Sequence, residues 1–391
     1  MDFDSHPLLS WLSQVRRDFH QNPELSFQEF RTTAKIKEIL SGLGIPLQEL
    51  PGLPTGAAGY LQGSGGRGKV IGMRGDIDAL PMTELNDVPY KSVNPGVMHS
   101  CGHDCHGTMV LGVAKKLVES GLARKLKGGV KFILQPAEEV AGGAKSMIEN
   151  GVLRTPPLDR VLAGHMFVDL PAGQVGFFKE NSHAAADTFK LTLLGKGAHG
   201  AHPHYGLDPV VAGAHLVTAL QSIVGRNVDP TESAVITVGQ LIAGTAPNII
   251  PDRLFLSGTV RTFKPHIRDL VKARLLEVVE ATAKAFRMEV DYQFIDGVPA
   301  CMVDPKVTEE VFQAAVKVLG EANVHWLKPK MGGEDFAYFT QAVPGTFMRV
   351  GCGNPAKGIA GRAHSPHFDV DETALAVGVE VFIEAIKTYL G

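Results

Sequence analysis

Apolar runs alternate with amphipathic stretches along the first half of the chain. Largely apolar runs predict three buried strands, at residues 69–74, 129–135 and 160–164. Apolar residues at helical spacing predict helices at about 8–19, 28–41, 106–117 and 142–149. Because strands alternate with helices, we expect an α/β fold in which a mostly parallel sheet has helices on both faces.

The pattern changes at about residue 184. The next elements are predicted in the order strand 189–193, helix 208–224, strands 233–241 and 254–260, helix 266–286 and strand 289–294. This order is typical of a ferredoxin-like α+β domain. We therefore expect residues 184–295 to be an inserted lid or dimerisation domain. Residues 1–183 and 296–391 would form the metal-binding catalytic domain, with further elements at 307–319, 324–327, 346–350 and 372–390.

Polar residues follow each of the first three predicted strands. Asp76 and Asp78 come after the first strand, Glu138 and Glu139 after the second, and His165 after the third. In parallel sheets, ligands bind beyond the carboxyl ends of the strands. We therefore expect these side chains to converge on one edge of the sheet.

A dense cluster of metal-ligand residue types, HSCGHDCH, occupies residues 99–106. His99, Cys101, His103 and Cys105 alternate, so in an extended segment they would share one face. Thiols and imidazoles in such density favour a metal site. A redox pair, a structural zinc knot and chance clustering of core residues are the competing interpretations. Cys101 and Cys105 lack the two-residue spacing of the usual redox motif.

Composition narrows the class of protein. A chain of 391 residues predicts two domains, and 44% hydrophobic with 20% charged residues is typical of a globular protein. The net charge is −3 and no basic stripe is evident, so we expect no nucleic-acid partner. Residues 1–14 carry acidic residues where a signal peptide has Lys or Arg, and no apolar run has the length of a membrane span. Four cysteines do not make a disulfide framework, so a reducing cytoplasm is expected.

Several motifs in order resemble the dinuclear metallo-amidohydrolases of the aminoacylase and carboxypeptidase clan, in the branch of hippurate hydrolases and auxin–amino acid conjugate hydrolases. The motifs that carry the resemblance are HSCGHD at 99–104, QPAEE at 135–139, GH at 164–165 and AH at 363–364. Residues 17–29, 73–81, 195–209, 245–251 and 331–336 also fit this branch. The resemblance spans nearly the whole chain.

The resemblance implies a site for two divalent ions, for which Zn, Mn, Co and Ni all suit a Cys/His/Glu ligand set. Cys101 would bridge the two ions. His103 and His165 would complete one site, and Glu139 and His364 would complete the other. Glu138 would be the general base for a metal-bridged hydroxide, because bound divalent ions lower the pKa of water to about 7. The alternative for Glu138 and Glu139 is a solvated pair at the start of a helix.

Asp76 and Asp78 fall where the clan has a carboxylate that supports the metal ligands, and Asp76 is predicted among the catalytic residues. The wider clan has a His ligand two residues before that Asp, whereas this chain has Arg74. In this branch, His103 is expected to substitute for the missing ligand.

The inserted region supplies further candidates. The resemblance implies that His199 stabilises the tetrahedral oxyanion, in its own or the neighbouring subunit's site; the alternative is a histidine of a turn. Asn248 and Arg261 are predicted to bind substrate. Arg261 is the candidate for the substrate's α-carboxylate, with a surface ion pair as its alternative. Glu334 is assigned only to the pocket lining. Two further groups are expected to be structural: the cysteines Cys105, Cys301 and Cys352, and the histidines His20 and His183.

The predicted function is metal-dependent hydrolysis of the amide bond of N-acyl or N-aroyl L-amino acids, with hippurate as the type. The same site would also serve a dipeptidase or carboxypeptidase, or an N-acetyl amino acid deacetylase. Outside this reaction class, the sequence is also compatible with a metal-binding scaffold derived from such an enzyme and with a thiol redox protein. The expected partners are a small-molecule substrate and further copies of the chain, as a homodimer or homotetramer, with no membrane association.

Overall fold

The computed structural model describes residues 3–391 and divides them into two compact units. Unit 1 comprises the described residues up to Ser182 together with Met302–Lys328 and Asp335–Gly391. Unit 2 comprises His183–Cys301 and Pro329–Glu334. Met1 and Asp2, the start of the stretch in which no signal peptide is expected, lie outside the described residues.

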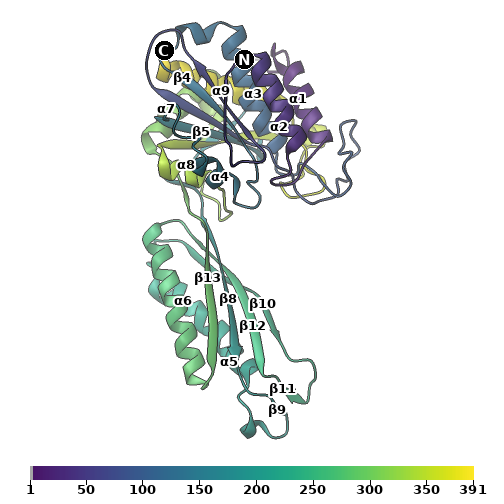
Figure 1. Cartoon of the computed structure of the whole chain (residues 1–391), viewed down its shortest axis with the longest axis vertical. Coiled ribbons are helices and arrows are strands. Elements are labelled where there is room, and N and C mark those ends of the chain that lie inside the picture. The colour runs from purple at the N-terminus through teal and green to yellow at the C-terminus, as the bar shows by residue number, and fades with distance from the viewer. Residues whose placement is uncertain (1–2) are drawn as a thin grey trace. The chain divides into compact units, whose positions relative to one another are not determined.

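Unit 1 is built on a mostly parallel sheet. Among residues 3–391, this sheet has eight strands in the order β1-β2-β4-β3-β5-β16-β6-β15. Strands β4 and β5 of this sheet are labelled in Figure 1. Its strands are β1 (Leu47–Gln48), β2 (Ala57–Gln62), β3 (Val70–Asp76), β4 (Gly129–Gln135), β5 (Arg160–Pro171), β6 (Val175–Phe177), β15 (Val324–Trp326) and β16 (Gly345–Gly353). The central strands β4, β3, β5 and β16 run parallel to one another. The predicted α/β class is therefore confirmed.

Helices cover this sheet and supply most of the core of unit 1. They are α1 (Leu9–Gln21), α2 (Phe30–Gly42), α3 (His103–Glu119), α4 (Gly143–Glu149), α7 (Pro305–Leu319), α8 (Ala337–Ala342) and α9 (Thr373–Leu390). Helices α3 and α9 pack against each other and are apolar around most of their circumference, so both are buried. This places the start of α3, and the ligand cluster beside it, on a rigid element.

Unit 2 has the predicted ferredoxin-like strand order. It contains β8 (Ala185–Leu194), β9 (Ala198–His199), α5 (Pro209–Asn227), β10 (Ala234–Ala243), β11 (Ile249–Ile250), β12 (Arg253–Thr262), α6 (Pro265–Ala285) and β13 (Glu289–Val298). Its main sheet is antiparallel, in the order β10-β12-β8-β13. Inward residues of β12, such as Leu254, pack with α5 and α6, while alternate residues such as Phe255 face the other side. The short strands β7 (Asn181–His183) and β14 (Cys301–Met302) lie where the chain passes between the units.

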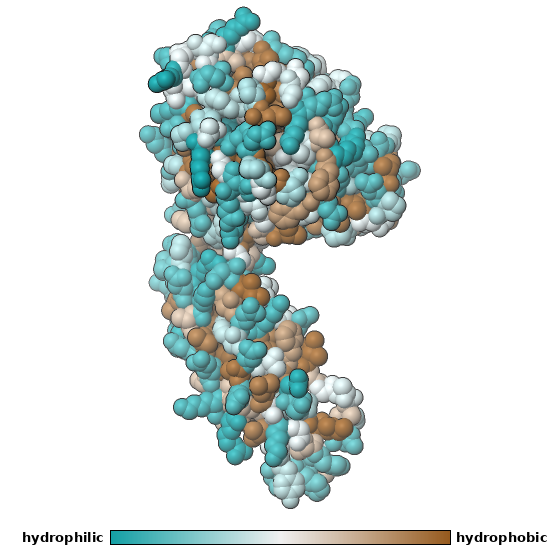
Figure 2. All heavy atoms as spheres, viewed as in Figure 1, coloured by the Kyte–Doolittle hydropathy of each residue, from teal (hydrophilic) through white to brown (hydrophobic). Residues whose placement is uncertain are grey.

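Hydrophobic residues remain on the surface of unit 2. Figure 2 shows them on the visible face, where β10 and β12 run in Figure 1. Strand β10 is an edge strand of its sheet, and Val235, Leu241 and Ile242 on it are 39%, 45% and 60% exposed. Such an apolar edge is a template for pairing with another chain.

Two local predictions were wrong. Helix α3 begins at His103 rather than His106, because Gly102 takes a left-handed conformation (φ 89°) and its carbonyl accepts the first helical hydrogen bonds. Cys101, His103 and Cys105 therefore do not share a face of an extended segment. His165 lies within β5 rather than at its end. In the part of the chain from residue 3 onward, no helix combines the length and apolarity that crossing a membrane requires.

Candidate metal centre and active site

Two groups of metal-ligand side chains in unit 1 share one thiol. Cys101, His103 and His165 form the first group, and Cys101, Glu139 and His364 form the second. Within each group the ligand atoms lie within 4.8 Å of one another. The thiol common to both groups is the residue for which the sequence predicts a bridging role. The five predicted metal ligands thus come together from parts of the chain more than 250 residues apart.

The register of the sheet explains how His165 reaches this place from within a strand. Strand β3 pairs with β5 so that Arg74 lies opposite Ala163. His165, two residues further on, is therefore level with Asp76 at the carboxyl end of β3. The predicted convergence on this edge of the sheet holds even though β5 continues to Pro171.

Hydrogen bonds fix which ring nitrogen of each histidine faces the other candidate ligands. His165 Nδ1 lies 2.7 Å from the carbonyl oxygen of Met166, to which it donates, so its Nε2 lone pair faces Cys101 Sγ at 3.5 Å. His103 Nδ1 donates to Asp78 at 3.1 Å, which leaves His103 Nε2 available as a ligand atom. His106 differs, because its Nε2 accepts from the Met166 amide at 2.8 Å and its Nδ1 donates to Asp76 at 2.5 Å. Both nitrogens of His106 are therefore used within the protein.

The pKa values follow from these surroundings. Burial lowers the pKa of His165, and the positive charge of Arg349 lowers it further, so this imidazole is neutral and ready to bind a cation. Burial alone would lower the pKa of His103, but Asp76 and Cys101 raise it well above its ordinary value. The nearby Cys101 thiol and Glu139 carboxylate raise the pKa of His364 to about 10. The ligands thus concentrate negative charge that a divalent cation would neutralise.

Glu138 and Glu139 lie on a tight turn after β4. Their carboxylates approach His103 Nε2 to 3.9 Å and 3.8 Å, and Glu139 Oε1 lies 3.5 Å from His364 Nε2. Both side chains are largely buried, with 12% and 11% exposure. This burial counts against the alternative of a solvated pair at a helix start.

The polar atoms present fit a metal ion. His103 Nε2 and Glu139 Oε1 are buried and form no hydrogen bond with any residue from 3 to 391. Buried polar atoms without a partner are costly, so such atoms facing each other at 3.8 Å indicate a cation site. The donor set of one thiol, three imidazoles and one carboxylate suits Zn, Mn, Co or Ni.

Arg74 is turned away from the ligands. Its guanidinium donates to Gln135 at 2.7 Å and to Asp335 at 2.9 Å, and it pairs with Asp76 at 2.7 Å. Asp76 therefore holds Arg74 and His106, and it approaches His103 Nε2 only to 3.7 Å. The carboxylate that hydrogen-bonds to His103 is that of Asp78.

Asp78 is the most connected acid of the site, and its role was only outlined by the sequence. Its two oxygens accept from His103, from Ser26 (2.7 Å) and from the backbone amides of Glu138 and Glu139 (both 3.0 Å). Burial would raise the pKa of Asp78, but hydrogen bonds from His103, Ser26 and Glu139 hold it below its ordinary value. The match of residues 17–29 to the branch was the only sequence signal that this segment supports the site.

Another cluster lies behind the start of α3. Asp104 accepts from Arg16 Nε and from His20 Nδ1, both at 2.8 Å, and His20 Nε2 lies 3.2 Å from Glu84. His99 is buried beside His20 and is not part of either ligand group. These contacts agree with a structural role for His20. Cys105 is buried in the core and forms no disulfide with Cys101.

Two of the unit 2 candidates, His199 and Asn248, are neighbours, because His199 pairs with Ile249, whereas Arg261 lies apart from them. His199 in β9 and Asn248 are exposed, and the Asn248 carbonyl accepts from the Gly200 amide. His199 Nδ1 accepts from the Ala201 amide, as in the turn alternative. Arg261 is half-buried near the other end of β12 and forms no ion pair among residues 3–391. Glu334 is buried in the segment Pro329–Glu334.

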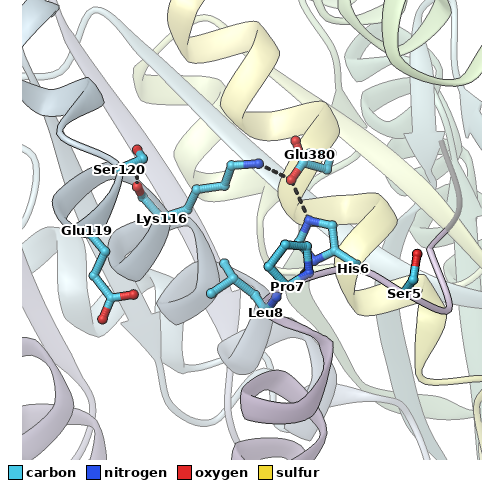
Figure 3. A pocket seen from close by; sticks show the side chains of 8 residues that line it. All are labelled: Ser5, His6, Pro7, Leu8, Lys116, Glu119, Ser120 and Glu380. Atoms are coloured by element: carbon cyan, nitrogen blue, oxygen red, sulfur yellow. Dashed lines mark hydrogen bonds and ion pairs between the residues drawn. The ribbon is translucent and has the colours of Figure 1, made fainter.

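A cavity of about 640 Å³ opens elsewhere in unit 1 (Figure 3). His6 and Lys116 both bind the same oxygen of Glu380 there. Lys116 lies in the last turn of α3, roughly 20 Å along the helix axis from His103. This cavity is therefore separate from the metal ligands.

Comparison with known proteins identifies the family of the chain. Residues 72–388 match the family described as Peptidase family M20/M25/M40, and the chain belongs to this family. Its relatives include an N-acetyl-L-cysteine deacetylase of Bacillus subtilis, which is 40% identical over 96% of this chain and 87% of the relative. The predicted enzyme class, a metallo-amidohydrolase, is confirmed.

Further relatives carry different names. The thermostable carboxypeptidase 2 of Saccharolobus solfataricus is 36% identical over 96% of this chain and 94% of its own length. The IAA-amino acid hydrolase ILR1-like 4 of Arabidopsis thaliana is 35% identical over 97% and 86%. A crystal structure of the Bacillus subtilis YXEP protein, described as a dinuclear metal-binding peptidase from the M20 family, matches with a TM-score of 0.84 and 33% identity over 98% of each chain.

Proposed function

We propose that this protein hydrolyses the amide bond of N-acyl or N-aroyl L-amino acids, releasing a carboxylic acid and an amino acid. The observation that carries the proposal is the thiol of Cys101, which belongs to two ligand groups at once. Two divalent ions at these groups would share an anionic ligand, and a thiolate at Cys101 would supply it. The similarity to an IAA-amino acid hydrolase and to a deacetylase supports the reaction class.

Five residues would hold two divalent ions, of which Zn, Mn, Co and Ni suit the ligands. His103 and His165 would serve one ion, Glu139 and His364 the other, and Cys101 both. When bound, the ions would polarise the amide carbonyl and lower the pKa of an attacking water. A reducing compartment such as the cytoplasm would keep the Cys101 thiolate available.

Glu138 would act as the general base. Its carboxylate lies 3.9 Å from His103 and outside the two ligand groups that share Cys101, so of the two adjacent glutamates it would be the one that carries the proton. It would accept the proton of the attacking water and deliver it to the leaving nitrogen. The weak contact of its Oε1 with the Asp335 amide, at 3.4 Å, would orient the carboxylate. Asp76 would act indirectly, by fixing His106 and Arg74 beneath the ligands.

Unit 2 would complete the site as a lid and dimerisation domain. His199 would stabilise the oxyanion, and Asn248 and Arg261 would bind the substrate, with Arg261 taking the α-carboxylate. Arg253, at the start of β12, pairs with Leu194, and His199 follows a few residues beyond Leu194. Arg261 lies eight residues further along β12, roughly 27 Å from that end of the strand and therefore far from His199. This separation supports a homodimer or homotetramer in which His199 serves the neighbouring subunit's site.

The same metal chemistry would also serve an N-acetyl amino acid deacetylase or a carboxypeptidase, the names that two relatives carry. A panel of hippurate, N-acetyl amino acids and free-amine dipeptides separates these substrates. We expect turnover of the N-acylated compounds and little turnover of the dipeptides. Preferred hydrolysis of dipeptides would instead assign the protein to the peptidases.

The deciding experiment replaces Glu138 by Ala and by Gln and measures both bound metal and turnover. We expect about two ions per chain to be retained and kcat to fall at least 100-fold. Chelation should abolish wild-type activity, and added Mn or Zn should restore it. Near-normal turnover by the Glu138→Ala variant would remove Glu138 as the base, and activity that survives complete chelation would remove the metal mechanism.

A further inference from the structure

The turn that carries Glu138 and Glu139 has an unusual backbone. Ala137 and Ala141, on either side of the two glutamates, have φ values of 53° and 57°. This left-handed region is unfavourable for residues with a Cβ and is occupied only where the surroundings enforce it. The Ala137 carbonyl accepts from the Gly142 and Gly143 amides, which closes the turn on one side. The backbone amides on the opposite side of the turn also need hydrogen-bond acceptors.

Two buried carboxylates hold three successive amides of this turn. The amides of Glu138 and Glu139 donate to Asp78, at 3.0 Å each. The amide of Ala137 donates to Glu29 Oε1 at 2.9 Å. Consecutive amides around a left-handed residue form a concave anion-binding nest, and here side chains of the protein fill it.

Glu29 is a buried carboxylate, and burying a carboxylate requires compensating contacts. It is fully buried, and no Lys, Arg or His among residues 3–391 forms an ion pair with it. The Thr55 hydroxyl donates to its Oε2 at 2.6 Å, and the Ala137 amide occupies its Oε1. Burial raises the pKa of Glu29. Burying an acid without a neighbouring cation costs free energy. The hydrogen bond from the Ala137 amide is one of the contacts that offset this cost.

We propose that Glu29 is a positioning residue for the active site: by holding the Ala137 amide, it fixes the direction in which Glu138 and Glu139 face His103. This rests on the proposed role of Glu138 as base. Glu29 lies outside the ligand set and 108 residues before Ala137 in the chain, in the segment 17–29, to which the sequence assigns no function. Ser26 of the same segment holds Asp78, so this segment supports the turn twice.

Loss of the Glu29 carboxylate would leave the Ala137 amide buried without an acceptor. The turn would then relax out of the left-handed conformation at Ala137, and the next two residues would rotate with it. Glu138 would lose its alignment with the attacking water, and Glu139 would lose its place as a ligand. Partners that orient metal ligands typically contribute 10-fold to 100-fold in metal affinity or activity.

The test compares Glu29→Ala with Glu29→Gln, in the full-length metal-loaded protein. A Gln keeps a carbonyl oxygen for the Ala137 amide, and its NH₂ group can donate to the Thr55 hydroxyl oxygen. We expect Glu29→Ala to lower kcat 10-fold to 100-fold with little change in KM, to weaken Mn binding at least 10-fold in a chelator competition, and to speed amide hydrogen exchange in residues 134–142. Glu29→Gln should restore all three to within 3-fold of the wild type.

Glu24→Ala is the matched control. Glu24 belongs to the same segment and accepts from the Arg31 and Thr32 amides at the start of α2, without touching the turn. We expect it to lower the melting temperature but to leave kcat, Mn affinity and the exchange of residues 134–142 within 3-fold. If Glu29→Ala fails to fold, Glu29→Asp, which keeps the charge but is one carbon too short, must show the same losses.

Equal effects of Glu29→Ala and Glu24→Ala, in proportion to lost stability, would overturn the proposal, as would wild-type exchange of the turn in Glu29→Ala. The Glu138→Ala variant in the same series judges the proposed function independently. If that variant stays active, the role of Glu138 as base fails, whereas the exchange and Mn-binding results still decide whether Glu29 holds the turn.

Discussion

Asp78 uses both carboxylate oxygens to join three parts of the candidate metal centre. It orients His103, and it holds the amides of Glu138 and Glu139. The sequence places Asp78 beside the site, because two acids follow a predicted strand. It does not distinguish Asp78 from Asp76, since both lie near the same strand end and only the register and side-chain directions decide which one meets His103.

Asp78→Asn should therefore weaken metal binding without unfolding the protein. An Asn can accept on one side only, so its NH₂ group would face the amide of Glu138 or Glu139. We expect a 10-fold to 100-fold loss of Mn or Zn affinity, measured by competition with a chelator. Unchanged affinity would show that the four hydrogen bonds to Asp78 do not position the ligands.

Lys131 is another buried charged group, and its hydrogen bonds are to residues other than the candidate metal ligands. Its ammonium group donates to three backbone carbonyls, those of Val152 (2.6 Å), Thr155 (2.9 Å) and Pro156 (2.9 Å). Burial lowers the pKa of Lys131 to about 8. It is thus protonated at neutral pH and ties β4 to the loop before β5.

The free energy of unfolding should depend on pH through the titration of Lys131. The folded-state pKa of about 8 lies below the unfolded value of 10.5, so between these values the unfolded chain binds more protons and the free energy of unfolding rises with pH. Relative to Lys131→Met, the wild type should gain up to about 3 kcal/mol between pH 8 and pH 10.5. Urea unfolding at several pH values measures this, and parallel curves for the two proteins would contradict it.

At the scale of elements, the sheet is more predictable than the geometry of its loops. The apolar runs 69–74, 129–135 and 160–164 became β3, β4 and β5, because burial on both faces leaves a continuous apolar signal. Strand β2 went unpredicted, since its short sequence AAGYLQ carries no such run. The start of α3 was misplaced because it depends on the conformation of one residue, Gly102.

Gly102 should be needed for metal binding as well as for the helix. Its φ of 89° disfavours any residue with a Cβ, and an added Cβ would lie 3.0 Å from Met166 Cβ. Gly102→Ala should cost about 1–2 kcal/mol of stability and shift Cys101 and His103, lowering metal affinity at least 10-fold.

Gly121→Ala provides the comparison for this effect. Gly121 also has a left-handed conformation at the start of a short helix, but an added Cβ there would meet no atom within 4 Å. We expect Gly121→Ala to lower the melting temperature and to leave metal affinity unchanged. Equal metal affinity in both variants would show that the start of α3 tolerates the strain.

At the scale of the whole molecule, the convergence of the candidate ligands could be predicted from the sequence, whereas their supports could not. Cys101, His103, Glu139, His165 and His364 come together as expected, because metal ligands have distinctive residue types and motifs. Supporting acids such as Glu29 resemble any surface acid in a sequence. Their partners lie about 100 residues away and are set by the folded chain alone.

The exposed edge of unit 2 predicts self-association. We expect the chain to be a dimer or a tetramer, and Ile242→Asp on the edge strand β10 should shift it toward the monomer. Light scattering after size-exclusion chromatography measures the mass. Leu276→Asp, at a 40% exposed position on α6, is the control and should leave the mass unchanged. A monomeric wild type would refute the prediction.

Because the second ligand group includes His364, the order of synthesis matters for how the ions are acquired. Cys101, His103 and His165 are synthesised before unit 2, whereas His364 is synthesised after it. The central strand β16, which pairs with β5, is also made after unit 2. A truncated product that stops within unit 2 therefore contains all three residues of one ligand group but lacks His364 of the second, so the binding of two ions would have to wait until residue 364 is made.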